Sequence, residues 1–185
     1  GGWGYRPFLL FLISYSLFFY PQIISKSQKN IQRFNHASRV MPYLVLTDLD
    51  IVECPPVLIR QWLAEPISKN LIFRIAVREV ESWVMADREG FSHFIHADIK
   101  VIPGDLDKLD DPKSFLLEKV RKYAGKDIRR DLLPRENSTA KIGPDYTGRL
   151  SEFLNENWSM RRALPHSHSL QRTVNTLNKF IPVNP

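Results

Sequence analysis

The sequence predicts an α/β fold in which a parallel sheet is flanked by helices, with a helical C-terminal half. Two short apolar segments, Tyr43–Leu49 and Leu71–Val77, have the length and aliphatic content of buried strands. A helical pattern follows each of them, and this alternation is typical of a parallel sheet that is covered on both faces. Beyond residue 110 the sequence is helical and loop-rich.

The helix after the first strand is predicted from its two prolines. Pro55 and Pro56 stand at the start of Val57–Leu63, where a missing backbone N–H does no harm. After the second strand, residues 78–95 run without a turn residue between strand and helix, and their apolar side chains recur at helical spacing. We therefore expect one continuous helical segment there.

The second half is predicted to hold three helices and one long irregular stretch. Asp111 and Pro112 form a cap and first-turn pair for the helix Lys113–Ala124. Residues 125–148 contain two prolines and three glycines, and a stretch of that length is either functional or mobile. The last two predicted helices are Arg149–Trp158 and Ser169–Phe180.

Composition indicates a globular protein with an uneven charge distribution. A chain of 185 residues with 43% hydrophobic side chains is long enough for one domain with its own core. Its single cysteine, Cys54, excludes an internal disulfide and fits a reducing cytoplasm. Residues 46–111 carry 13 acidic and 7 basic side chains, whereas residues 112–185 carry 14 basic and 7 acidic ones. This charge distribution is expected if an acidic centre holds cations while basic flanks contact a polyanion. An ordinary solvated surface would give the same distribution.

The first 27 residues do not fit the pattern of the core domain. Phe8–Tyr20 is a 13-residue apolar run, and a membrane-spanning helix takes about 20 such residues, so membrane attachment is not expected. We interpret residues 1–27 as a glycine-rich start plus an apolar insertion, and residues 28–181 as the α/β domain with its helical C-terminal part. An anchor or a misassembled segment would also account for the run.

Two aspartates end the first predicted strand. Asp48 and Asp50 lie on the same side of an extended chain, with Leu49 pointing away. Ligands of parallel sheets bind outside the carboxyl ends of the strands, which is where this pair stands. Adjacent carboxylates repel each other unless a proton or a cation intervenes, and oxygen ligands suit Mg²⁺ or Mn²⁺. Asp48 and Asp50 are therefore candidate metal ligands, the alternative being one capping and one surface aspartate.

Three more carboxylates follow the second predicted strand. If the two strands are neighbours, Glu79, Glu81 and Asp87 join the aspartate pair on one rim of the sheet. Glu81 and Glu79 are the candidate catalytic residues, as auxiliary metal ligands or as a base. In the alternative interpretation the glutamates favour the helix dipole in a first turn and Asp87 pairs with an arginine.

Other polar residues carry weaker signals. His166 and His168 could ligate a metal, but alternate histidines beside a proline more often cap a helix. No P-loop, Gly-x-Gly-x-x-Gly or zinc pattern is present. Basic side chains in the 125–148 stretch are candidates for binding nucleic-acid phosphates, or else belong to a solvated loop. These candidates are Arg129, Arg130, Arg135 and Lys141.

From about Gln28 to Phe180 the chain resembles the bacterial domain of unknown function 4276 family. The resemblance rests on six blocks in order: FNHASRVMPYLVLTDLD, CPPVLIRQWL, LIFRIAVREVESWVMADREG, DPKSFL, STAKIGPDYTGRLSEF and NWSMRRALPHSHSLQR. It implies a Toprim-like, Rossmann-like fold. It also implies a setting in phage defence, beside an ATPase.

The resemblance also implies a chemistry. Toprim domains hold Mg²⁺ for phosphodiester chemistry with an Asp-x-Asp motif, a role that falls here on Asp48 and Asp50, and with a glutamate after their first strand. Residues 1–42 contain no acidic side chain, so the chain looks like a fragment that lacks the N-terminal strand. The expected function is a Mg²⁺- or Mn²⁺-dependent nucleic-acid phosphodiesterase, weak or inactive in this chain alone. The alternative is a non-catalytic, Toprim-like binding or regulatory partner of an ATPase.

Overall fold

The computed structural model describes residues 23–52, 54–63 and 66–183. The predicted apolar run Phe8–Tyr20 and the glycine-rich start lie outside these residues. The predicted insertion also included residues 23–27, which form the first part of helix α2 (Ile23–Ala37). None of the helices within the described ranges has the length and apolar character needed to cross a membrane.

A two-stranded parallel sheet forms the centre of the N-terminal half. Strand β1 (Tyr43–Asp48) pairs with β2 (Leu71–Ala76) so that Asp48 lies opposite Ala76. Helix α3 (Pro55–Trp62) connects the two strands, and it begins at the prolines as predicted. The predicted mixed α/β class and the parallel neighbours are thus confirmed, with this sheet found within the described part of the chain.

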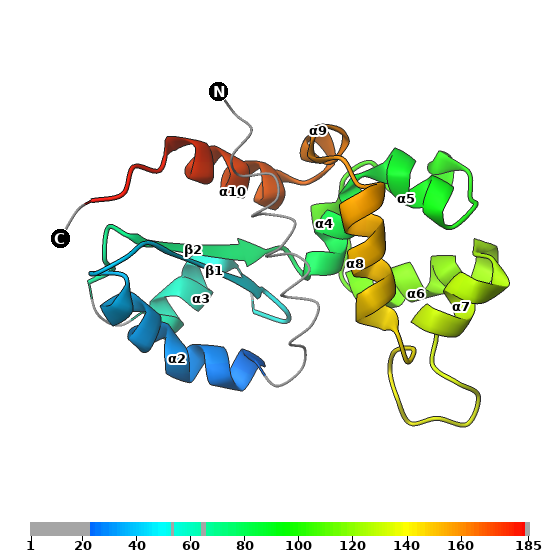
Figure 1. Cartoon of the computed structure of the whole chain (residues 1–185), viewed down its shortest axis with the longest axis horizontal. Helices are drawn as coiled ribbons and strands as arrows, with labels where there is room; N and C mark the ends of the chain where they lie inside the picture. Colours follow the sequence, from blue (N-terminus) through cyan, green and yellow to red (C-terminus); the bar gives the residue numbers. More distant parts are fainter. Residues whose placement is uncertain (1–22, 53, 64–65, 184–185) are drawn as a thin grey trace.

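The face of the sheet toward α2 and α3 carries the odd-numbered side chains of both strands, because side chains alternate along a strand. Ile31 of α2 and Leu58 of α3 pack there, and Trp62 stacks on Phe73 with ring centroids 5.8 Å apart. Figure 1 shows α2 and α3 together on this side of the sheet. The cluster covers this face of both strands.

The other face carries the even-numbered side chains, and α10 (His168–Lys179) covers it (Figure 1). Ile72 and Ala76 of β2 belong to the same core as Leu170 and Val174 of α10. The chain end beyond α10 is fastened to the turn before β2, because Asn70 exchanges two hydrogen bonds with the backbone of Val183. Helix α10 and the segment after it therefore hold β2 and the turn before it in place.

The helical half packs around Trp83, Phe91 and Phe153, which are fully buried. Its helices surround this core at one end of the sheet (Figure 1). They are α4 (Val80–Ala86), α5 (Arg88–Phe94), α6 (Pro112–Tyr123), α7 (Lys126–Leu132), α8 (Tyr146–Glu156) and α9 (Met160–Ala163), with short 3₁₀ turns at Ile99–Val101, Leu106–Lys108 and Leu164–His166. The predicted helical C-terminal half is confirmed.

Two expectations about these helices are wrong. The segment 78–95 is not one helix, because Asp87 ends α4 and caps α5 by accepting a hydrogen bond from the Gly90 N–H at 3.0 Å. The stretch 125–148 is not wholly irregular, since it contains α7, whose Ile128 and Leu132 lie one turn apart and are buried. That i, i+4 apolar pair was the helical signal in the sequence.

Candidate carboxylate site at the end of the sheet

Asp48 stands at the end of β1 and is only 8% exposed. Its Oδ1 accepts a hydrogen bond from the Val80 backbone N–H at 2.8 Å, which ties the end of β1 to the start of α4. Burial raises the pKa of Asp48 well above its usual value, and the neighbouring Glu81 raises this pKa further. Asp48 is thus a carboxyl group whose charged form is poorly stabilised by the protein alone.

Glu81 lies in the first turn of α4 and is 1% exposed. Its Oε1 accepts a hydrogen bond from the Tyr146 hydroxyl at 2.9 Å and lies 3.2 Å from Nζ of Lys113. Its Oε2 is buried and has no hydrogen-bond partner among the described residues. Burying a carboxylate oxygen without a hydrogen-bond partner costs free energy. This atom is therefore the part of the site that would gain most from a bound partner.

Glu79 is the residue that precedes α4, and it faces the first turn of α6. Its Oε2 accepts a hydrogen bond from the Lys113 backbone N–H at 2.9 Å. Burial and then the charge of Glu81 raise the pKa of Glu79 to about 7. A pKa near neutral pH suits a group that accepts or donates a proton in catalysis.

Tyr146 closes the inner side of this carboxylate site, which we define as Asp48, Asp50, Glu79 and Glu81. Burial raises the pKa of Tyr146 well above its usual value, and the carboxylates around it add to this effect. Its hydroxyl therefore stays protonated and keeps donating to Glu81. The site thus has a neutral donor and the Lys113 ammonium group on its inner side.

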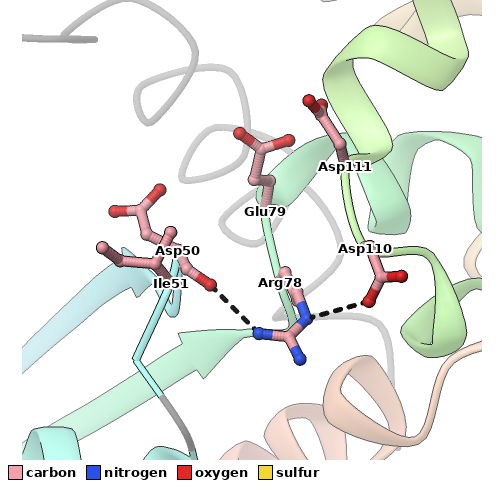
Figure 2. Close-up of a pocket in the computed structure, with 6 residues that line it drawn as sticks. All are labelled: Asp50, Ile51, Arg78, Glu79, Asp110 and Asp111. Atoms are coloured by element: carbon pink, nitrogen blue, oxygen red, sulfur yellow. Dashed lines mark hydrogen bonds and ion pairs between the residues drawn. The ribbon is translucent and has the colours of Figure 1, made fainter.

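Asp50 lies outside the strand, in a turn with φ 50°, a left-handed conformation that aspartate tolerates better than most residues. It lines an open pocket of about 430 Å³ together with Ile51, Arg78, Glu79, Asp110 and Asp111. In Figure 2 the carboxylates of Asp50 and Glu79 project to the same side, whereas Arg78 turns toward Asp110, its Nε 3.8 Å from Oδ1. Asp50 and Glu79 are thus the two members of the carboxylate site that line this open pocket, whereas Asp48 and Glu81 are buried.

Asp87 does not belong to the carboxylate site, so the expectation of five converging carboxylates is wrong. It is fully buried and forms a two-pronged ion pair with Arg162, with both N–O distances 2.7 Å, and it also accepts a hydrogen bond from the Ser159 N–H. The structure thus confirms the alternative interpretation, in which Asp87 pairs with an arginine. Its role is to join α5 to the start of α9.

The basic candidates lie on α7 and in the segment that follows it, away from the strand ends (Figure 1). Arg130 is fully exposed and already forms ion pairs with Asp127 and Asp131. The other three candidates, Arg129, Arg135 and Lys141, are exposed. Nucleic-acid binding by these four residues remains a prediction.

Of the two histidines, His166 contributes to local structure. His166 Nδ1 lies 2.7 Å from the Gly104 carbonyl oxygen. The cap of α10 is Ser167, whose hydroxyl accepts a hydrogen bond from the Leu170 N–H, so the capping residue lies between the two histidines. His168 is the first residue of α10 and is exposed.

Two residues of the site were missed by the analysis of the sequence. Lys113 and Tyr146 lie 32 and 65 residues after Glu81, and no local pattern connects them to it. Lys113 directly follows the predicted Asp111–Pro112 cap, which the structure confirms, because Asp111 Oδ1 accepts the Ser114 N–H at 2.8 Å. The start of α6 was therefore predictable, but its contact with α4 was not.

In the described ranges, no three histidine, cysteine, aspartate or glutamate side chains are arranged as a ready set of metal ligands. The donor chemistry nevertheless suits a hard cation, since carboxylate oxygens predominate and one buried oxygen of Glu81 lacks a partner. Comparison of the chain with models of protein families, with curated proteins and with solved structures found no match.

Proposed function

We propose that this protein is a Mg²⁺- or Mn²⁺-dependent phosphodiesterase that acts on nucleic acid. The observation that carries the proposal is the unpartnered, buried Oε2 of Glu81 beside Asp48, a carboxyl whose pKa is already raised. A divalent cation would bind that oxygen and remove the repulsion between Glu81 and Asp48. The proposed ligands are Asp48 and Asp50, with Glu81 as the auxiliary ligand.

Bound there, the ion would polarise a phosphoryl oxygen and lower the pKa of a coordinated water. The chain's own residues would supply the rest of the chemistry. Glu79 lines the open pocket, and with a pKa of about 7 it is suited to take a proton from an attacking water. Tyr146 and Lys113 hold Glu81 in one orientation from the inner side.

The resemblance to Toprim-like proteins supports the same proposal. Asp48 ends a strand of a parallel sheet, Asp50 follows it, and a helix connects that strand to its neighbour. This arrangement agrees with a Toprim-like or Rossmann-like fold, which we infer for the domain. Nucleic-acid phosphates would then contact exposed basic groups such as Arg129, whereas Arg130 is largely neutralised by its two aspartates.

Metal binding can be tested without any assay of activity. Saturating Mg²⁺ or Mn²⁺ is expected to raise the Tm of the wild-type protein by about 5 °C or more, relative to EDTA. The double variant Asp48→Asn, Asp50→Asn should lose this increment. The control is Glu136→Gln with Glu156→Gln, which removes two negative charges from exposed positions and should keep it. An equal metal response in all three proteins would contradict the proposed site.

Cleavage is tested on labelled single-stranded and duplex DNA and RNA with each ion. We expect Asp48→Ala to abolish metal-dependent cleavage and Glu79→Gln to reduce it by about 10²-fold or more. The resemblance implies a further glutamate on a preceding strand. The assay is therefore run both on this chain and on a longer protein in which such a strand precedes it. If the extended protein cleaves nothing with either ion, even with an associated ATPase present, the binding or regulatory function becomes the better account.

A further inference from the structure

The face of the sheet that bears Asp48 also bears an arginine. Side chains alternate along the strands, and β2 pairs Ala76 with Asp48 and Arg74 with Leu46, so Arg74 lies on the same face, two residues before the strand end. That separation corresponds to about 7 Å along the strand. A charged residue in the middle of a sheet face is unusual, because its burial is costly without a partner of opposite charge.

Arg74 is held by a hydrogen bond to α10 and has no acidic partner among the described residues. Its Nε donates to Oγ1 of Thr173 on α10 at 3.2 Å, and Thr173 is itself 1% exposed and bonded to the Ser169 carbonyl. Within the described part of the chain its guanidinium forms no ion pair. Burial, and then the neighbouring positive charge of Arg172, lower the pKa of Arg74 from its usual value. The remaining donors of the guanidinium are therefore available to an anion.

Arg172 supplies a second positive charge near Arg74. It precedes Thr173 on α10 and is exposed, and it too forms no ion pair with any described residue. Beside the two arginines, Leu44 and Leu46 of β1 are only half-buried, so α10 covers β2 more completely than β1. Two neighbouring positive charges without a carboxylate repel each other, and an oxyanion bound by both would reduce that repulsion.

We propose that Arg74 and Arg172 together bind a phosphate group of the nucleic-acid backbone. This phosphate would lie close, along the same nucleic-acid strand, to the phosphate that reacts at the carboxylate site. The proposal rests on the proposed function for the identity of the polyanion. The arginine pair would position the substrate by charge-assisted hydrogen bonds that are independent of base sequence. It lies on the sheet and α10, whereas the basic residues of 125–148 lie in the helical half (Figure 1).

Binding is measured by fluorescence anisotropy of labelled single-stranded oligonucleotides in EDTA, so that no metal contributes. Arg74→Gln and Arg172→Gln should each weaken binding about fivefold or more at 0.1 M salt, and each should lower the slope of log K against log salt by about 0.7. The control Arg121→Gln removes an equal charge from an exposed position on α6 and should change the affinity less than twofold. Since Arg172 is exposed, its variant stays informative even if Arg74→Gln misfolds.

Equal effects of Arg172→Gln and Arg121→Gln would show a general charge effect and would overturn the inference. Inorganic phosphate, titrated against the wild type and the Arg74→Gln variant, provides a second arm. Saturable phosphate binding that needs Arg74, without any oligonucleotide binding, would assign the site to a small phosphate and overturn the nucleic-acid assignment. Arginine-dependent binding without any cleavage would support this inference while the phosphodiesterase proposal failed.

Discussion

Glu79 is the carboxylate of the site that changes its charge near neutral pH. Its pKa of about 7 in the folded protein compares with 4.5 for an ordinary glutamate, mainly because it is partly buried and lies near Glu81. The folded state therefore binds the proton more tightly than the unfolded state does. The resulting contribution to stability is fully present below pH 4.5 and is lost as the pH rises through about 7.

The variant Glu79→Gln tests this pH dependence, because glutamine can still accept the hydrogen bond from the Lys113 N–H. Between pH 5 and pH 8, the free energy of unfolding should fall by about 1 to 2 kcal/mol more in the wild type than in Glu79→Gln, after allowance for solvent screening. Urea denaturation at both pH values measures the difference. The exposed-site control Glu136→Gln should behave like the wild type, and identical slopes for all three proteins would contradict the assignment.

At the level of elements, the end of α7 and the start of α8 are held close together by a glycine. The Gly143 N–H donates to the Leu132 carbonyl at 2.9 Å, and the Asp145 N–H donates to that of Asp131 at 3.1 Å. A Cβ at position 143 would lie 2.5 Å from the carbonyl carbon of Leu132 and would clash with backbone on α7. This close approach sets where α8 begins, and hence where Tyr146 reaches the site.

Gly143→Ala is expected to reduce the free energy of unfolding by about 1 to 3 kcal/mol, because the backbone of α7 must move to admit the methyl group. Gly104→Ala is the matched control. A Cβ at position 104 would meet nothing within 4 Å, so its effect should stay within about 0.5 kcal/mol. Chemical denaturation measures both variants, and a Gly143→Ala protein as stable as the wild type would show that α7 adapts freely.

Features that depend on local sequence patterns were predictable, whereas features that depend on contacts between distant residues were not. The strands and their parallel order were readable, because burial on both faces leaves short aliphatic runs beside helical patterns. The predicted parallel order of the strands also predicted that Asp48 and Glu81 lie at the same edge of the sheet. The break at Asp87 was not readable, since it depends on Arg162, 75 residues later. The same holds for Tyr146, whose contact with Glu81 follows from packing between α4 and α8.

At the level of the whole molecule, the sheet joins two cores. Ile72 faces the large core of the helical half, whereas Ile75 faces the smaller cluster around α2 and α3, and both side chains are at most 7% exposed. Because side chains of the same strand contribute to both cores, neither core is expected to unfold without disturbing the strand. We therefore expect a single cooperative unfolding transition for the described part of the chain.

Ile72→Val and Ile75→Val test this expectation, each removing one buried methylene group from a different core. Each should lower the free energy of unfolding by about 1 kcal/mol and shift the midpoints from far-UV circular dichroism and tryptophan fluorescence equally. Two transitions, only one of which responds to Ile75→Val, would show that the cores unfold separately.

The contact between β2 and α10 has a consequence for synthesis on the ribosome. Ile72 and Ala76 of β2 pack in the same core as Leu170 and Val174 of α10, which lie about a hundred positions further along the chain. Until those residues emerge from the ribosome, α10 cannot cover this apolar surface. Nascent chains that contain the sheet but lack α10 are thus expected to expose a surface that chaperones bind and that promotes aggregation.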